Sequence, residues 1–99
     1  MSDKVENRNR AVLDAAVALA ERFGMAAVTR PRVSAESGLS TGTVSNAFGT
    51  MDGLRDAVMA AAVQREIVVI VAQGLAERHP AAVNAPAELK QRALEKLAA

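Results

Sequence analysis

The chain has 99 residues and a formal net charge of +1, and 51% of its residues are hydrophobic while 2% are aromatic. This length allows one small domain with a modest core and leaves room for a second apolar surface buried against a partner. Because the chain has no cysteine, disulfides and thiolate metal sites are excluded. The apolar run 67–72, like every other apolar run in the chain, is too short to span a bilayer. We therefore expect a cytoplasmic protein without a membrane segment.

The first predicted helix runs from about Arg8 to Phe23 and ends at Gly24, which can cap it. Its apolar residues recur every three or four positions, the period of a helix with one core face: Val12, Ala15, Ala16, Leu19 and Phe23. Positive charges outnumber negative ones six to three between Lys4 and Arg32. This local excess favours contacts with nucleic acid in the first third of the chain.

Two short helices joined by a tight turn at Gly38 are predicted between Val33 and Phe48. The first covers about 31–37 with Thr29 as its N-cap, and the second covers about 41–48 with Ser40 as its N-cap. A small residue, Ser34, lets the helices cross closely, and glycine can take the positive φ that the turn needs. This is the pattern of a helix-turn-helix.

The outward face of the second short helix carries hydroxyls and an amide, with no charge from Ser37 to Met51. Such groups suit the reading of base edges in a DNA major groove. We expect Asn46 to pair with adenine, and arginines before the first short helix to contact phosphate. Gly42 weakens its helix, and either an approaching DNA backbone or packing against the first helix would explain it. The residues expected to contact DNA are Arg10, Thr29, Arg30, Arg32, Ser40, Thr41, Gly42, Thr43, Ser45 and Asn46.

A fourth helix is predicted from about Met51 towards Gln73, followed by breaks at Gly74 and at His79. A last amphipathic helix is predicted at 87–97. The run 67–71 is apolar all round, so either the C-terminal segment or another subunit must cover it. Its five consecutive β-branched residues leave a buried strand as an alternative. The residues expected to form a dimer interface are Ile67, Val68, Val69, Ile70, Val71, Leu89, Leu94 and Leu97.

From Arg10 to about Val58 the chain resembles the N-terminal DNA-binding domain of the tetracycline-repressor (TetR) family. The matching residues are Val12–Ala16, Leu19, Phe23–Gly24, Thr29, the run Gly38–Val44, Phe48 and Leu54. The resemblance implies a dimeric repressor bound to a palindromic operator in double-stranded DNA. Ser45 stands where that family usually has tyrosine, Asn46 where it often has histidine and Met51 where a lysine usually meets phosphate. Residues 43–46 also look like the recognition helix of lactose-repressor-type proteins.

The expected architecture is all-α: a three-helix head with a helix-turn-helix in residues 1–50, then a dimerisation region in residues 51–99 with a long fourth helix and a short C-terminal helix. The C-terminal region is short beside the family's usual ligand domain, so we expect no small-molecule effector and no cofactor. The single histidine and the lack of a nucleophile elbow argue against an enzyme and against a metal site.

Two functions remain open at this stage. The first is a sequence-specific DNA-binding transcriptional regulator, in the form of a small dimeric repressor. The second is a helical protein–protein adaptor without DNA binding, which would use the apolar surface at 67–71.

Overall fold

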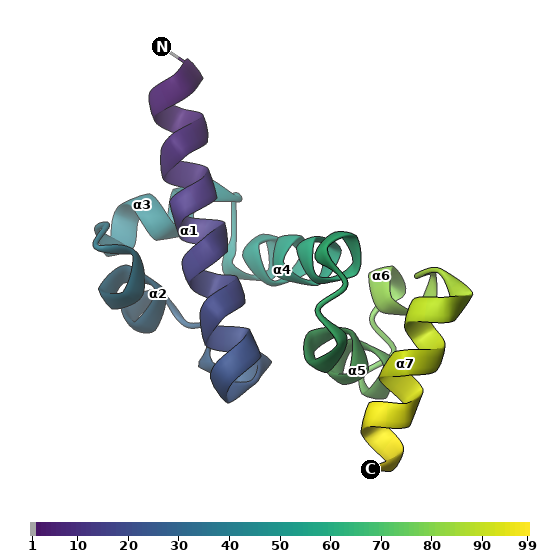
Figure 1. Ribbon diagram of the computed structural model, residues 1–99. Coiled ribbons are helices and arrows are strands. Elements are labelled where there is room, and N and C mark those ends of the chain that lie inside the picture. Colours follow the sequence, from purple (N-terminus) through teal and green to yellow (C-terminus); the bar gives the residue numbers. More distant parts are fainter. Residues whose placement is uncertain (1) are drawn as a thin grey trace. The chain divides into compact units, whose positions relative to one another are not determined.

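The computed structural model describes residues 2–99, and these form helices and short connections with no strand among them (Figure 1). The predicted all-α class is therefore confirmed. The chain divides into two compact units, one running to Val58 and the other spanning Met59–Ala99. Helix α4, Met51–Arg65, contributes residues to both, and the boundary expected after residue 50 lies at its start. No helix in this described part is long and apolar enough to cross a membrane.

The N-terminal unit is built around α1, Ser2–Phe23. It packs against the short 3-10 helix η1 (Met25–Ala27), α2 (Arg30–Ser37) and α3 (Thr41–Ala47). Four predicted core residues of α1 are buried there, namely Val12, Ala15, Ala16 and Leu19, together with Val33 of α2 and Val44 of α3. Helix α1 also buries Val17 and Ala20, which the predicted period did not include. Burial of this apolar surface is the main force that holds the three helices together.

Helix α1 differs from its prediction at both ends. It begins at Ser2 and not near Arg8, because its first turns are exposed and so carry no apolar period to reveal them. It ends as predicted at Gly24, which has a φ of 92°. Phe23, however, is 62% exposed, and the guanidinium of Arg22 lies 5.2 Å from the centre of its ring. Periodicity predicts which face a side chain takes, not whether another element covers it.

The C-terminal unit contains α5 (Val68–Ala76), α6 (Pro80–Val83) and α7 (Ala87–Ala98). Helix α5 packs on both of the others. The prediction for the last helix is correct. The prediction that the fourth helix continues to Gln73 is wrong, because α4 ends at Arg65. His79 does not lie in a plain loop but caps α6, its Nδ1 accepting a hydrogen bond of 3.1 Å from the amide of Ala81.

The break between α4 and α5 is a helix C-cap with an unusual residue. Glu66 has a φ of 56°, its amide bonds to the carbonyl of Val63, and the next amide, that of Ile67, reaches back to Ala62 over 2.8 Å. Arg78, with a φ of 58°, ends α5 in the same way. Glycine normally holds this position, so the end of α4 was not visible in the sequence. The end of α5 was signalled only by the predicted break at His79, which directly follows Arg78.

The apolar run 67–71 is helical from Val68 onwards, which excludes the strand alternative. Ile70 and Val71 are fully buried, and α5 packs on α7, which buries Leu89 and Ala93. The C-terminal segment therefore covers the inner side of the run. Ile70, Val71 and Leu89, expected at a dimer interface, lie in the core of their own unit. Ile67, Val68 and Val69 are half-buried.

Gly74 lies inside α5 and does not break it. A Cβ at this position would come within 2.6 Å of the Met59 sulfur and 2.7 Å of the Ala82 Cβ. The flexible methionine can yield, but Ala82 is fixed to the backbone of α6. The glycine is therefore required by the close approach of α5 and α6.

Replacing Gly74 with alanine should lower the free energy of unfolding by roughly 1–3 kcal/mol, because overpacking outweighs the gain in helix propensity. Chemical denaturation monitored by circular dichroism measures this change. Unaltered or increased stability would show that α5 and α6 can separate without loss.

Candidate nucleic-acid interface

The turn between α2 and α3 is held by glycine and by two serines. Gly38 has a φ of 75°, and its amide bonds to the carbonyl of Ser34 over 2.9 Å. The Ser34 hydroxyl donates to the Leu39 carbonyl over 2.5 Å, and the Ser37 hydroxyl accepts from the Leu39 amide over 3.2 Å. Both polar backbone groups of Leu39 are thus satisfied by α2 side chains. The sequence indicated that the small side chain of Ser34 lets the helices cross, but it did not indicate this hydrogen bond.

The start of α2 presents two arginines. Arg30 and Arg32 are exposed, and among the described residues neither has an acidic partner within ion-pair distance. Thr29 caps the helix, since its hydroxyl accepts from the amide of Arg32 over 3.4 Å. Its predicted capping role is confirmed, and a DNA contact by Thr29 remains a prediction. Two cations beside a helix N-terminus form a surface suited to phosphate.

Arg55 of α4 holds the segment that leads into α2, and this role was not predicted from the sequence. Its guanidinium donates to the Val28 carbonyl over 3.2 Å and to Asp52 over 3.0 Å. Val28 directly precedes Thr29, so this contact ties the beginning of α4 to the cap of α2. The spacing of Asp52 and Arg55 was a usable sequence signal for the ion pair, whereas the contact with Val28 depends on the fold.

Helix α3 turns a polar face outward. Ser40 caps it, accepting from the Thr43 amide over 3.1 Å, and the hydroxyls of Ser40 and Thr43 lie 2.9 Å apart in a hydrogen bond. Val44 is buried and faces the core. Thr41, Gly42 and Asn46 are exposed, and Ser45 is half-buried.

Gly42 stands in open space on this face. A Cβ there would meet only the Ser40 hydroxyl, at 3.9 Å. Packing against α1 therefore does not explain the glycine, and this alternative from the sequence is excluded. The open space leaves the approach of an outside molecule as the remaining explanation of the two.

A groove of about 280 Å³ lies between the N-terminal turns of α1 and the helix α3. The residues that line it are Val5, Arg8 and Asn9 of α1 and Thr43, Asn46 and Ala47 of α3. Two expected contact residues, Thr43 and Asn46, thus lie beside α1 residues that the sequence did not single out. Arg10 was expected to contact DNA but does not line this groove.

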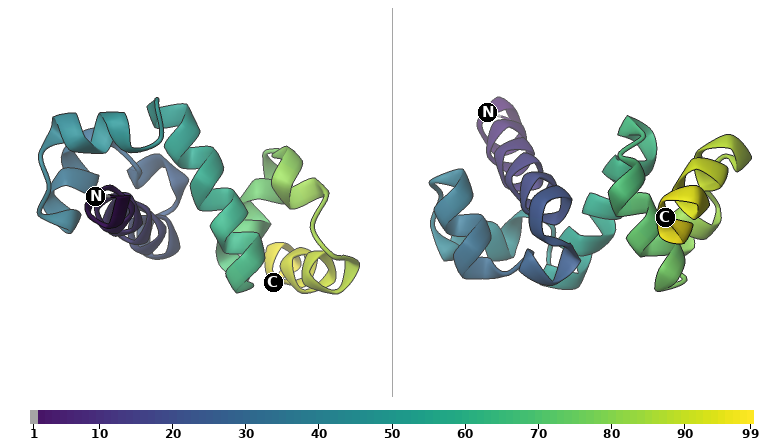
Figure 2. Two further views of the ribbon diagram at one scale, coloured as in Figure 1. Left: turned by 90° about the horizontal axis from the view of Figure 1, so that it is seen from above. Right: turned by 60° about the horizontal axis from the view of Figure 1, so that its bottom comes forward.

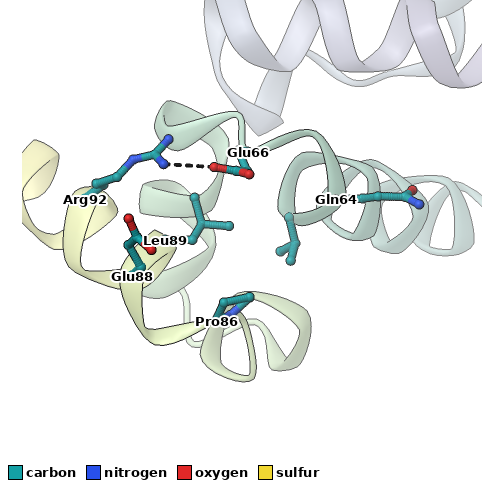
Figure 3. Close-up of a pocket in the computed structure, with 7 residues that line it drawn as sticks. Gln64, Glu66, Pro86, Glu88, Leu89 and Arg92 are labelled. Atoms are coloured by element: carbon teal, nitrogen blue, oxygen red, sulfur yellow. Dashed lines mark hydrogen bonds and ion pairs between the residues drawn. The ribbon is translucent and has the colours of Figure 1, made fainter.

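A larger groove of about 500 Å³ lies in the C-terminal unit, at the end of α4 and the start of α7 (Figure 3). Arg92 donates to Glu66 across it over 2.9 Å, and Glu88 adds a second carboxylate. With two acidic groups and one guanidinium, this lining disfavours phosphate. Within residues 2–99, no group of three or more His, Cys, Asp or Glu is placed to hold a metal ion.

Comparison with known proteins bears on the N-terminal unit. Residues 12–58 match the family model described as bacterial regulatory proteins, tetR family. This segment therefore has the sequence features of a tetR-family DNA-binding domain. The match ends at Val58, which is also the last residue of the N-terminal unit, so the matched segment lies within one compact unit. No curated protein and no solved structure matched the chain.

Replacing Gly42 with alanine separates stability from DNA binding. Alanine should raise the free energy of unfolding by about 1 kcal/mol, because it favours helix and meets nothing in the chain. It should weaken duplex binding if the α3 backbone approaches DNA there. Thermal unfolding and fluorescence titration with duplex DNA measure the two effects, and unchanged affinity would remove Gly42 from the contact surface.

Proposed function

We propose that the protein is a transcriptional repressor that binds a palindromic operator as a homodimer. That it is a DNA-binding regulator of the tetR type rests on the family match. The observation that carries the finer proposal is the exposed, uncharged face of α3, held against α2 by the serine-bonded turn at Gly38. A rigid helix with hydroxyl and amide groups is suited to base edges in the major groove.

Different residues have different roles in this proposal. The exposed amide of Asn46 can pair bidentately with adenine. The Thr43 hydroxyl already bonds to Ser40, so its methyl group is the part left to meet a thymine methyl. Arg30 and Arg32, without acidic partners among the described residues, are placed to contact phosphates and to set the register of α3.

Dimerisation is proposed to use the outer face of α7. Leu94 and Leu97 are 51% and 50% exposed, and Val83 of α6 is 44% exposed. Leu89 and Ala93, on the adjoining strip of α7, are buried in the core of the unit. A twofold dimer through this surface would carry two reading helices, which an inverted repeat matches.

The same exposed leucines favour a second candidate, a helical adaptor that binds another protein and not DNA. The two candidates differ in one measurable property. A DNA reader binds duplexes with an affinity that falls steeply with salt, whereas an adaptor shows no such binding.

Selection of bound sequences from a random duplex pool tests the operator. We expect an inverted repeat whose half-sites lie about 10 bp apart, or a multiple of that spacing.

Replacing Leu94 with glutamate should give a folded monomer with weaker operator binding, because a charge enters the proposed interface. Replacing Ile70 with glutamate should instead unfold the C-terminal unit, since Ile70 is fully buried.

Sedimentation and circular dichroism distinguish these variants. Selected sequences without dyad symmetry, or an unaltered dimer of the Leu94→Glu variant, would contradict the proposed assembly.

Substitutions of Asn46 and Arg32 separate base reading from anchoring. Asn46→Ala should weaken binding to the selected operator by roughly 1–3 kcal/mol and leave random DNA nearly unaffected. Arg32→Ala should weaken both equally and lower the salt slope by approximately 0.9. Titrations at two salt concentrations measure both. If Asn46→Ala leaves the ratio of specific to random affinity unchanged, Asn46 does not read bases.

A further inference from the structure

The groove between α1 and α3 extends the surface that α3 presents to DNA. The N-terminal turns of α1 project beyond the other helices of their unit (Figures 1 and 2). These turns line the groove with Val5, Arg8 and Asn9, which lie beside Asn46 and its neighbours on α3. Any duplex that meets the outer face of α3 therefore also lies close to this part of α1.

Charges on these turns are sorted by face. Successive residues of an α-helix are rotated by about 100°, so Lys4 lies beside Arg8 on one flank of the groove. Glu6 lies on the opposite flank, beyond Asn9, and Arg10 lies further round the helix. The flank that carries Arg8 is therefore basic, and the acidic Glu6 is on the other flank.

The neighbours of Arg8 along the helix point to an external anion. Lys4 lies four residues before Arg8, and like charges at this spacing repel each other. Val12, four residues after Arg8, carries no charge. Among the described residues Arg8 has no ion pair. Arg10 has the opposite setting, with Glu6 and Asp14 at the same spacings. A repelled, unpaired arginine is suited to bind a negative group from outside the chain.

The groove offers donors that fit a phosphodiester. The guanidinium of Arg8 and the amide of Asn9 line its α1 side without being assigned to bases, and no carboxylate lines it. Its volume of about 280 Å³ far exceeds the roughly 30 Å³ of one water molecule in the liquid. We propose that this groove holds a backbone phosphate of the duplex that α3 reads, with Arg8 as its charged contact. This inference rests on the proposed DNA-binding function.

Arg8→Ala and Arg22→Ala form a matched pair, because both residues are exposed arginines on α1, and Arg22 lies at the far end of the helix in an ion pair with Glu36. Each variant is titrated against the selected operator and against a random duplex at several salt concentrations, after circular dichroism has shown that it is folded. Arg8→Ala should lower affinity for both duplexes roughly fivefold to tenfold near 100 mM salt and reduce the salt slope by about 0.9. Arg22→Ala should leave the slope unchanged, and Arg8→Lys should restore it.

Ethylation interference on the operator locates the phosphate. Wild type and Arg22→Ala should share one sensitive phosphate that Arg8→Ala no longer requires. Equal effects of the two alanine variants, or no effect of Arg8→Ala, would overturn the assignment while DNA binding itself stands. A wild-type chain that binds no duplex even at low salt would instead overturn the proposed function and this contact with it.

Discussion

The orientation of α3 depends on the closure of one turn. Gly38 takes a left-handed conformation, and Ser34 and Ser37 bond both backbone polar groups of Leu39. These bonds fix the crossing of α2 and α3 while Val33 and Val44 bury the seam between them. If the turn opened, the amide of Asn46 and the arginines of α2 would lose their common orientation. A reading surface made of weak polar groups functions only when such groups are held in register.

The N-terminal unit could be predicted closely because its signals are local. Thr29 and Ser40 cap their helices through their own side chains, and Gly24 and Gly38 supply positive φ where two helices end. Each of these effects involves residues within four positions of one another, so a single sequence reveals them. The exposed start of α1 was not predicted, because helix turns that no other element covers carry no apolar period. For the same reason Arg8 was not recognised as a neighbour of α3.

The C-terminal unit was predicted less well, because its geometry opposes local preference. Glu66 and Arg78 hold left-handed positions that glycine usually takes, whereas Gly74 lies within a helix. Contacts far apart in the sequence act at two of these positions: Met59 and Ala82 leave no room beside Gly74, and Arg92 pairs with Glu66. The same packing places Ile70 in a core rather than on a surface. Residue patterns within a few positions do not contain this information.

The covering of α5 by α7 also bears on how the chain behaves when it is partly unfolded. Residues 67–71 are five apolar β-branched residues without proline or charge, a composition typical of segments that pair as strands between molecules. In the folded unit, Ile70 and Val71 are buried in α5, which packs on α7. Detachment of α7 would expose this apolar segment to other molecules. The last helix therefore acts as protection against aggregation, and conditions that loosen it would reduce the yield of folded protein.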